Sequence, residues 1–216
     1  MAIALFGGTF NPVHLGHLRI ATELAELLDV DEMRLIPCAI PPHREAPEVS
    51  AKQRMEMLEL AIGNHSVLRA EDLELKRQGT SYTIDTVAQI RKERGDSEPL
   101  YLCIGMDSLR SLDSWHRWQE LMDYCHIVVA ARPESEEPHD GPVVDVINRT
   151  HTQAVQSMRQ QACGLLAICE LSMLPISSTV IREKIQQKLS IDYLTPQPVV
   201  DYIQQHHLYQ HPFTSN

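Results

Sequence analysis

The stretch GGTFNPVHLGH (residues 7–17) follows the apolar run Ala2–Phe6. We expect a strand, a turn at the two glycines, and then a helix that starts at Asn11-Pro12, since Asn caps helices and Pro suits their first turn. His14 and His17 are three residues apart, so they share one helix face near its N-terminus. The N–H groups and partial positive charge at a helix N-terminus favour an anion.

The two histidines therefore indicate a phosphate site. A phosphate beside them would raise their pKa and favour the charged, doubly donating form of each ring. Gly16 lies between them and leaves a flat surface for a planar base. Other phosphate loops are not present, because the chain has no G-x-x-x-x-G-K-[ST] and no G-x-G-x-x-G string. A zincin is excluded too, since the spacing is wrong and no Glu follows His14.

Short apolar runs alternate with helical patterns along the 216 residues. Expected strands are Ala2–Phe6, Met33–Pro37, Ser66–Ala70, Pro99–Ile104, His126–Ala131 and Leu165–Leu171. Expected helices are Val13–Leu28, Ala51–Ile62, Thr83–Glu93, Ser114–Tyr124, Ser178–Lys188 and Pro198–His206. Continuous apolar strands are buried on both faces, so the alternation predicts an α/β fold: a doubly wound, mostly parallel, Rossmann-like sheet with helices on both faces.

We expect a single domain over residues 1–216, because this length suits one α/β domain. The stretch PESEEPHDG (Pro133–Gly141) is acidic and rich in breakers, which predicts a surface loop. It opens a variable segment, 134–164, with a helical excursion over about 142–163. Residues 175–210 form a small C-terminal helical part.

Composition limits the partners. The net charge of −10 argues against a nucleic-acid partner, whose footprint is usually basic, although a few Arg and His can still make a local anion site. Five cysteines without a C-x-x-C pair argue against a disulfide framework or zinc ribbon and favour reduced thiols in a cytoplasmic protein. We see no signal peptide and no membrane span, and we expect a monomer or small homo-oligomer.

A second motif, ISSTVIREKI (Ile176–Ile185), opens the helix after the last strand. Ser177, Ser178 and Thr179 can cap that helix. Arg182 lies close to the helix N-terminus, where cations are disfavoured, so it is easier to explain beside an anion, although it can also point to water. Two phosphate-suited helix N-termini from opposite halves of the chain predict one cradle for a triphosphate.

The string His14-Leu15-Gly16-His17 resembles the H-x-G-H signature of the nucleotidyltransferase superfamily, which class I aminoacyl-tRNA synthetases share. The whole stretch 7–17 is similar to that of bacterial nicotinate-nucleotide adenylyltransferases, and ISSTVIR resembles the family's I-S-S-T-x-I-R motif. The resemblance extends along nearly the whole chain and is weakest at 134–164. No K-M-S-K-S string is present, and the chain is short for a synthetase.

The resemblance implies adenylyl transfer from ATP to nicotinate mononucleotide in NAD biosynthesis, with Mg²⁺ delivered by ATP. It implies that His14, His17 and Arg182 are catalytic. The implied ATP-binding residues are Gly7, Gly8, Thr9, Phe10, His14, Gly16, His17, Gly105, Asp107, Ser177, Ser178, Thr179 and Arg182. Asp107 can also cap the next helix, and the two roles do not exclude each other.

The resemblance also implies a site for the acceptor. In PPHR (residues 41–44), His43 and Arg44 would touch the mononucleotide's phosphate, or lie in a solvated loop. The remaining implied residues are Tyr82, Thr83, Ile84, Trp115 and Arg132. Thr83 is in addition the expected N-cap of its helix, and a carboxylate at that helix N-terminus is favourable.

Two other functions fit the same fold. One is an adenylyl- or cytidylyltransferase that acts on another phosphate acceptor, such as phosphopantetheine. The other is a non-catalytic nucleotide sensor. Within the first reading, the sequence does not separate nicotinate from nicotinamide mononucleotide, because a few backbone donors decide between a carboxylate and an amide.

Overall fold

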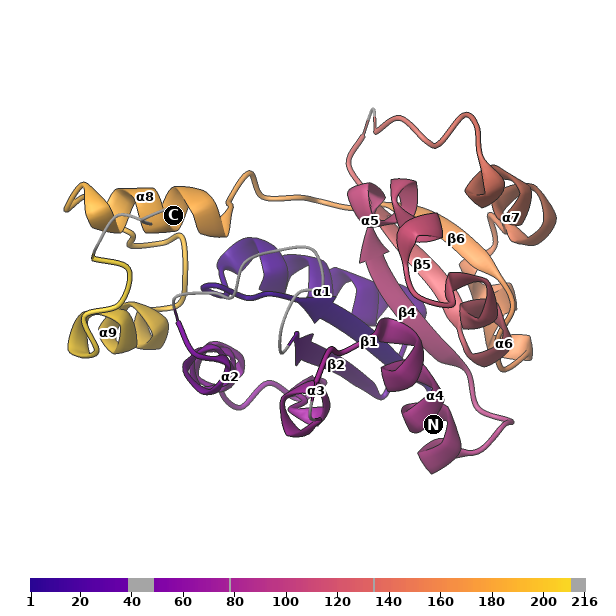
Figure 1. Ribbon diagram of the computed structural model, residues 1–216, viewed down its shortest axis with the longest axis horizontal. Coiled ribbons are helices and arrows are strands. Elements are labelled where there is room, and N and C mark those ends of the chain that lie inside the picture. Colours follow the sequence, from indigo (N-terminus) through magenta and orange to yellow (C-terminus); the bar gives the residue numbers. More distant parts are fainter. Residues whose placement is uncertain (39–48, 78, 134, 211–216) are drawn as a thin grey trace.

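The computed structural model describes residues 1–38, 49–77, 79–133 and 135–210 (Figure 1). These residues form a six-stranded sheet in the order β3-β2-β1-β4-β5-β6, and every neighbouring pair is parallel. The strands are β1 (Ile3–Gly8), β2 (Glu32–Pro37), β3 (Leu68–Ala70), β4 (Leu100–Gly105), β5 (His126–Ala131) and β6 (Leu166–Glu170). This order reverses between β1 and β4, as in a doubly wound sheet, and ligands bind in the crevice at such a reversal.

All six expected strands are confirmed, and so is the parallel, doubly wound arrangement. The central strands consist of apolar runs because both faces are covered, and all six residues of β5 are buried. Side chains alternate between two cores. Ala4 and Phe6 of β1 enter one core, while Ile3 and Leu5 enter the other.

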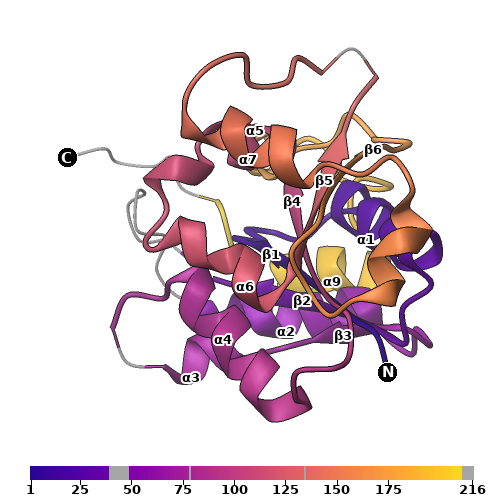
Figure 2. The same cartoon turned by 90° about the vertical axis from the view of Figure 1, so that its right-hand side faces the viewer.

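Helices cover both faces of the sheet (Figure 2). One core contains side chains of α1 (Leu15–Leu28), α2 (Ala51–Ile62), α8 (Ser178–Gln186) and α9 (Gln197–Gln205). The other contains side chains of α4 (Thr83–Arg94), α5 (Met106–Arg110), α6 (Leu121–Tyr124) and α7 (Pro142–Thr150). A short α3 (Leu73–Lys76) follows β3. Among the residues described, no helix has the length and apolar character that crossing a bilayer requires.

One expected helix was wrong, while the other five expected helices and the helical excursion after residue 141 are confirmed. The stretch Ser114–Tyr124 is not one helix, because it divides into 3-10 turns at Leu112–Ser114 and Trp118–Glu120 before the four-residue α6. The excursion after residue 141 is α7 followed by a 3-10 segment, Val155–Gln160. The short helices α3 and α5 were not expected, since one turn leaves too few residues for a helical period.

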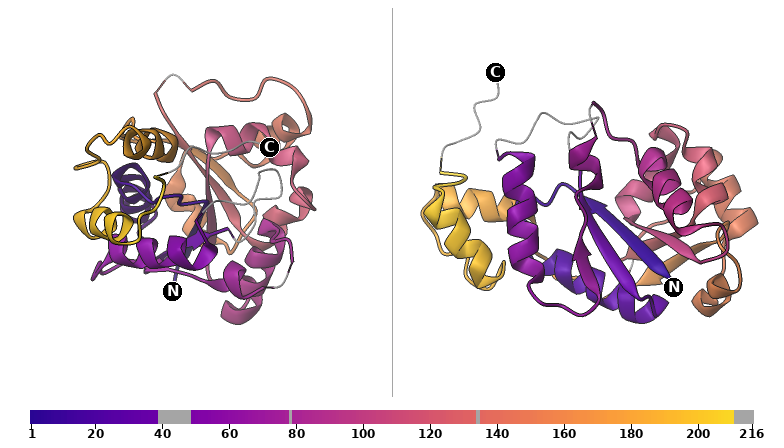
Figure 3. Two further views of the ribbon diagram at one scale, coloured as in Figure 1. Left: turned by 60° about the vertical axis from the view of Figure 1, so that its left-hand side comes forward. Right: turned by 90° about the horizontal axis from the view of Figure 1, so that it is seen from below.

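The C-terminal part lies at one end of the molecule, where an extended segment connects β6 to α8 (Figure 1). Helix α9 packs against α2 (Figure 3), and the Tyr202 hydroxyl donates to Glu56. The segment between α8 and α9 reaches the start of α1: the Thr195 hydroxyl donates to the Val13 carbonyl at 2.8 Å, and the Leu15 N–H donates to Leu194 at 3.0 Å. The C-terminal helical part and the start of the first helix are thereby joined.

A buried arginine organises the opposite edge of the sheet. Arg91 of α4 is 6 % exposed, and its guanidinium donates at 2.7 to 3.0 Å to four backbone carbonyls. Those carbonyls belong to Gly95, Glu98, Tyr124 and Ala162, which precede β4, β5 and β6 in the chain. Charge-assisted bonds to carbonyls are among the stronger hydrogen bonds. Arg91 therefore fixes the loops that enter three neighbouring strands.

We expect Arg91→Met to lower the free energy of unfolding by about 1–3 kcal/mol, because it leaves buried carbonyls without donors. Lys92→Met on the exposed side of the same helix is the matched control and should change it by less than about 0.5 kcal/mol. Urea unfolding followed by circular dichroism measures both. Equal effects for the two variants would contradict a stabilising role for Arg91.

Candidate active site

The N-terminus of α1 is capped by its own histidines. His14, not Asn11, is the N-cap residue, so the helix starts later than the sequence suggested. The Nδ1 atom of His14 accepts from the His17 N–H, and Nδ1 of His17 accepts from the His14 N–H, both at 3.3 Å. The two rings stack with centroids 3.6 Å apart. The i, i+3 spacing predicted that both histidines share one helix face, and the structure confirms that their rings lie together.

This mutual cap fixes the tautomer of each ring. A ring nitrogen that accepts an N–H has no proton, so the single proton of each neutral imidazole lies on Nε2. The doubly donating form expected for a phosphate site does not fit this geometry, because Nδ1 of both rings is already an acceptor. Each histidine presents one directed N–H donor, at Nε2.

Burial keeps both rings neutral. Loss of solvent lowers the pKa of His14 from 6.5 to about 4. The pKa of His17 falls to about 3, first through burial and then through the neighbouring His14. Two charged imidazoles in stacking contact would repel each other, so the neutral pair is the stable form near pH 7.

The glycines of the motif make room for aromatic rings. A Cβ on Gly8 would lie 2.9 Å from the Phe10 ring, and a Cβ on Gly16 would lie 3.0 Å from Nδ1 of His14. The planar group that lies against Gly16 is therefore the motif's own imidazole, which corrects the expectation of a bound base there. Phe10 meets His17 edge to face with centroids 5.0 Å apart. The turn thus packs Phe10 against the histidine pair.

The N-terminus of α8 docks on the same turn. The Ser177 hydroxyl caps α8 by accepting from the Val180 N–H, and the Ser178 hydroxyl donates to the Pro12 carbonyl at 2.8 Å. Arg182 donates to the Asn11 carbonyl at 2.7 Å and to the Thr179 hydroxyl at 3.4 Å. The expected convergence of the two motifs is confirmed, although 160 or more residues separate these partners in the chain.

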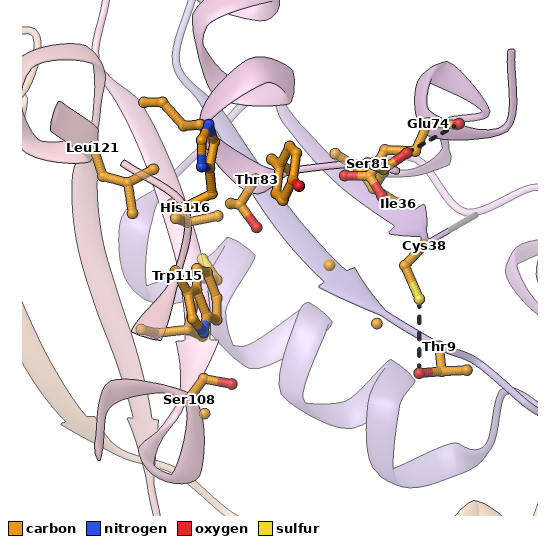
Figure 4. A pocket seen from close by; sticks show the side chains of 18 of the residues that line it. Thr9, Ile36, Cys38, Glu74, Ser81, Thr83, Ser108, Trp115, His116 and Leu121 are labelled. Carbon is orange, nitrogen blue, oxygen red and sulfur yellow. Dashed lines mark hydrogen bonds between the residues drawn. The ribbon is translucent and has the colours of Figure 1, made fainter. Parts of the chain in front are cut away.

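A cavity of about 620 Å³ opens where the strand order reverses (Figure 4). Figure 4 shows Thr9 and Cys38 on one side of it and Trp115 and His116 on the other. Eight of the expected site residues line it: Gly7, Gly8, Thr9, Tyr82, Thr83, Ile84, Gly105 and Trp115. His14, His17 and the α8 turn are not in its lining, so the site consists of a cavity and an adjoining pair of helix N-termini, which Thr9 and Phe10 connect.

The N-terminus of α4 forms one wall of the cavity. Tyr82, not Thr83, occupies the N-cap position, and no side chain caps it. The expected Thr83 cap was therefore wrong by one residue, and the first N–H groups of α4 remain for another acceptor. The Tyr82 ring lies 4.3 Å from the His116 ring. An aromatic wall beside a helix N-terminus suits a planar anion.

The other expected residues lie elsewhere. The Asp107 side chain is exposed and pairs with Arg110 at 3.1 Å, and Asp107 belongs to α5 without making a side-chain cap. Arg132 follows β5 on the surface, where its N–H donates to Ser135 at 3.0 Å. Neither residue lines the cavity. His43 and Arg44 lie outside the described residues.

Sequence reasoning missed three groups near the site. His116 and Glu74 line the cavity, and Arg54 binds the backbone behind it. Burial raises the pKa of Glu74, and its Oε1 accepts from the Thr86 hydroxyl at 2.9 Å. Arg54 had a signal in the sequence, since it takes a place on the apolar stripe of α2 with Met57 and Leu58. Among the described residues, no group of three His, Cys, Asp or Glu side chains is placed to bind a metal ion.

Comparison with known proteins shows the family of the chain. A family model described as cytidylyltransferase-like matches residues 5–184. The chain is 42% identical over 208 residues to a probable nicotinate-nucleotide adenylyltransferase of Pectobacterium atrosepticum, with 96% of this chain and 98% of the relative covered. It is 43% identical over 208 residues to the protein of the same name from Cellvibrio japonicus, at the same coverage.

Solved structures are similar in fold. The Plasmodium falciparum nicotinic acid mononucleotide adenylyltransferase complexed with NaAD superposes with a TM-score of 0.73, covering 98% of both chains at 16% identity. A putative nicotinate-nucleotide adenylyltransferase from Vibrio parahaemolyticus gives 0.64, covering 98% of this chain and 96% of the other at 17% identity. At such identities these structures support the fold of the chain.

The histidine pair makes stability depend on pH. Both pKa values are lower in the folded chain than the ordinary 6.5, so the unfolded chain binds more protons below pH 6.5. The free energy of unfolding should therefore fall as the pH falls from about 6.5 towards 4. His17→Asn keeps an acceptor oxygen for the cap but does not titrate, and it should flatten this fall.

Urea unfolding at a series of pH values measures the effect, and histidine ring NMR gives the two pKa values directly. A wild-type pKa near 6.5 for both His14 and His17 would contradict the neutral, mutually capped pair.

Proposed function

The chain belongs to the cytidylyltransferase-like family and, within it, to the nicotinate-nucleotide adenylyltransferases, and we propose from the site's geometry how it transfers the adenylyl group of ATP to nicotinate mononucleotide. The products are nicotinate adenine dinucleotide and pyrophosphate, as NAD biosynthesis requires. The observation that supports this most strongly is the contact between the α1 and α8 N-termini beside the cavity at the strand reversal. In this proposal the paired helix N-termini hold the phosphate chain, and the cavity holds the planar pyridine ring.

The phosphate chain of ATP lies, in this proposal, across the N-termini of α1 and α8. The helix N–H groups and the Nε2–H donors of His14 and His17 bind the α- and β-phosphate oxygens. Arg182 and the hydroxyls of Ser177 and Thr179 bind the tail, while Ser178, whose hydroxyl donates to the Pro12 carbonyl, holds the α8 turn against the α1 turn. Gly7, Gly8, Thr9, Phe10 and Gly16 shape the turn, while Gly105 at the end of β4 faces the ribose.

The 5′-phosphate of nicotinate mononucleotide attacks the α-phosphorus of ATP in line, and the bond to the bridging oxygen of pyrophosphate breaks. The nucleophile is already an anion at neutral pH, so no protein group has to remove a proton. Negative charge moves to the leaving pyrophosphate, and donors already aimed at it lower the barrier. Neutral imidazoles serve well here, because their protons are held at Nε2 by the mutual cap.

The pyridine ring occupies the cavity. Trp115 and Tyr82 provide aromatic faces for it, and the uncapped N–H groups of Thr83 and Ile84 donate to its carboxylate at the positive end of α4. His43 and Arg44, which lie outside the described residues, would bind the mononucleotide phosphate, whereas Arg132 lies on the surface outside the cavity lining and is given no contact in this proposal. This arrangement favours nicotinate over nicotinamide through backbone donors.

Mg²⁺ enters as part of the ATP substrate. Since the described residues offer no cluster of carboxylate, His or Cys ligands, the ion stays bound to phosphate oxygens and water, which is its usual preference at nucleotide sites. It neutralises charge on the triphosphate. The proposed partners are the small molecules ATP and nicotinate mononucleotide, without nucleic acid. The cytoplasmic location and the monomer or small homo-oligomer stay predictions.

A pyrophosphate-release assay with MgATP and a panel of acceptors tests the function. We expect release with nicotinate mononucleotide, weaker release with nicotinamide mononucleotide, and none with phosphopantetheine. Release only with phosphopantetheine would point to the other transferase. ATP binding without release for any acceptor would point to a nucleotide sensor.

Replacing one phosphate donor should lower kcat by about 10²–10³. His17→Ala and Arg182→Ala test this, because each removes a donor aimed at the phosphates. Lys184→Ala on the same helix as Arg182 is the control and should keep kcat within about twofold, since Lys184 makes no contact with the proposed site. Circular dichroism checks folding. Activity within about tenfold of wild type would remove the altered residue from this role.

A further inference from the structure

We propose that Arg54 is a positioning residue for the phosphate site, because its guanidinium binds the turn that follows β1 and Cys38 at the end of β2. The inference rests on the proposed adenylyl transfer and assigns a role to a residue outside the expected site. Arg54 does not line the cavity. It acts through the backbone of Thr9 and Cys38.

Arg54 stands in an unusual place. It is 0% exposed, and it shares the buried face of α2 with Met57 and Leu58. A charged side chain is almost never fully buried unless it is paired, because burial removes its hydration. Burial lowers the pKa of Arg54, but a guanidinium stays protonated in proteins. A fixed positive charge therefore lies under the turn that follows β1.

Its partners are two carbonyls at the edge where the site forms. One terminal nitrogen donates to Thr9 and the other to Cys38, both at 2.7 Å. The same two loops meet directly, since the Cys38 N–H donates to the Gly8 carbonyl at 3.0 Å and the Cys38 thiol contacts the Thr9 hydroxyl at 3.7 Å. Arg54 thus joins the first turn of the motif to the end of the neighbouring strand.

The direction of these carbonyls matters for an anionic substrate. A carbonyl oxygen carries partial negative charge and repels phosphate, whereas an N–H attracts it. In a planar trans peptide the C=O and the following N–H point in opposite directions. Because Arg54 holds the Thr9 carbonyl, the Phe10 N–H points away from the guanidinium. Without Arg54 this peptide could turn and present its oxygen to the triphosphate.

The next residues of the turn are held from other sides. Asn11 is 8% exposed, its Oδ1 accepts from the Tyr209 hydroxyl at 2.7 Å, and its carbonyl accepts from Arg182. Tyr209 also lies near enough to Arg54 to raise the pKa of the guanidinium. The turn between β1 and α1 is therefore fixed by groups from α2, α8 and the chain beyond α9. A small shift of this turn displaces Phe10 and the histidine that it contacts.

Arg91 provides a matched comparison within the same chain. It too is a buried arginine that donates to backbone carbonyls, but those carbonyls precede the strands, at the edge away from the site. If both buried arginines serve only stability, replacing either one with Met should leave kcat/KM of the folded variant unchanged. If Arg54 positions the turn, only its replacement should reduce catalysis.

The test compares Arg54→Met, Arg54→Lys and Arg91→Met in the full-length chain, at a temperature where each is folded by circular dichroism. We expect Arg54→Met to lower kcat/KM by about 10²-fold, since small misplacements of positioned groups have effects of this size. Arg54→Lys has one compact charge in place of the guanidinium fork, so its kcat/KM should lie between those of Arg54→Met and wild type. Arg91→Met should keep kcat/KM within about threefold of wild type, since it alters the remote edge.

Two further readouts separate positioning from stability. Millimolar guanidinium chloride should partly restore the kcat of Arg54→Met and leave that of Arg91→Met unchanged. Calorimetric titration with MgATP should show weaker binding for the Arg54 variants only, and this result does not depend on which acceptor the enzyme uses. If the wild-type chain forms no dinucleotide, the proposed function fails, while the titration still tests Arg54.

The proposal is overturned if folded Arg54→Met keeps wild-type kcat/KM and ATP affinity, or if Arg91→Met loses as much activity. If Arg54→Met does not fold, Arg54→Lys decides by the same measurements.

Discussion

The reciprocal hydrogen bonding of His14 and His17 is the constraint on which the site depends. Each ring accepts the other residue's backbone N–H, so two residues satisfy two helix N-terminal donors and fix each other's orientation. The same bonds place the remaining proton of each ring on Nε2. A motif of four residues thereby determines a cap, two tautomers and the direction of two donors.

Other parts of the chain support this pair. Phe10 packs on His17, and Gly8 and Gly16 exist as glycines because aromatic rings occupy the space of their Cβ atoms. The turn that leads to the pair is bound by Ser178 and Arg182 from α8. In a chain with a net charge of −10, the proposed phosphate site therefore consists of helix N-termini and donors held by local contacts.

A buried arginine binds backbone carbonyls at each end of the strands, with a different consequence at each end. A buried arginine at each edge collects backbone carbonyls from loops that are distant in sequence. At the amino ends of the strands, Arg91 fixes the loops that enter β4, β5 and β6. At the carboxyl edge the same chemistry orients peptides next to a cavity, so the rigidity of the core extends into the loops where ligands bind.

The sequence by itself determined the sheet and the nature of the site. Apolar runs marked all six strands, and the glycines, histidines and ISST string identified the two phosphate-suited helix N-termini, because these signals are local. It could not determine that His14 caps its own helix, that Tyr82 precedes α4 without a cap, or that Ser114–Tyr124 breaks into short turns. Asn11 and His14, like Tyr82 and Thr83, offer competing helix starts within a few residues, so local preferences do not fix the boundary. Only the tertiary structure placed Arg54 under Thr9 and Cys38 and Ser178 against Pro12, since partners so far apart in the chain meet only when the sheet and both helical layers are assembled.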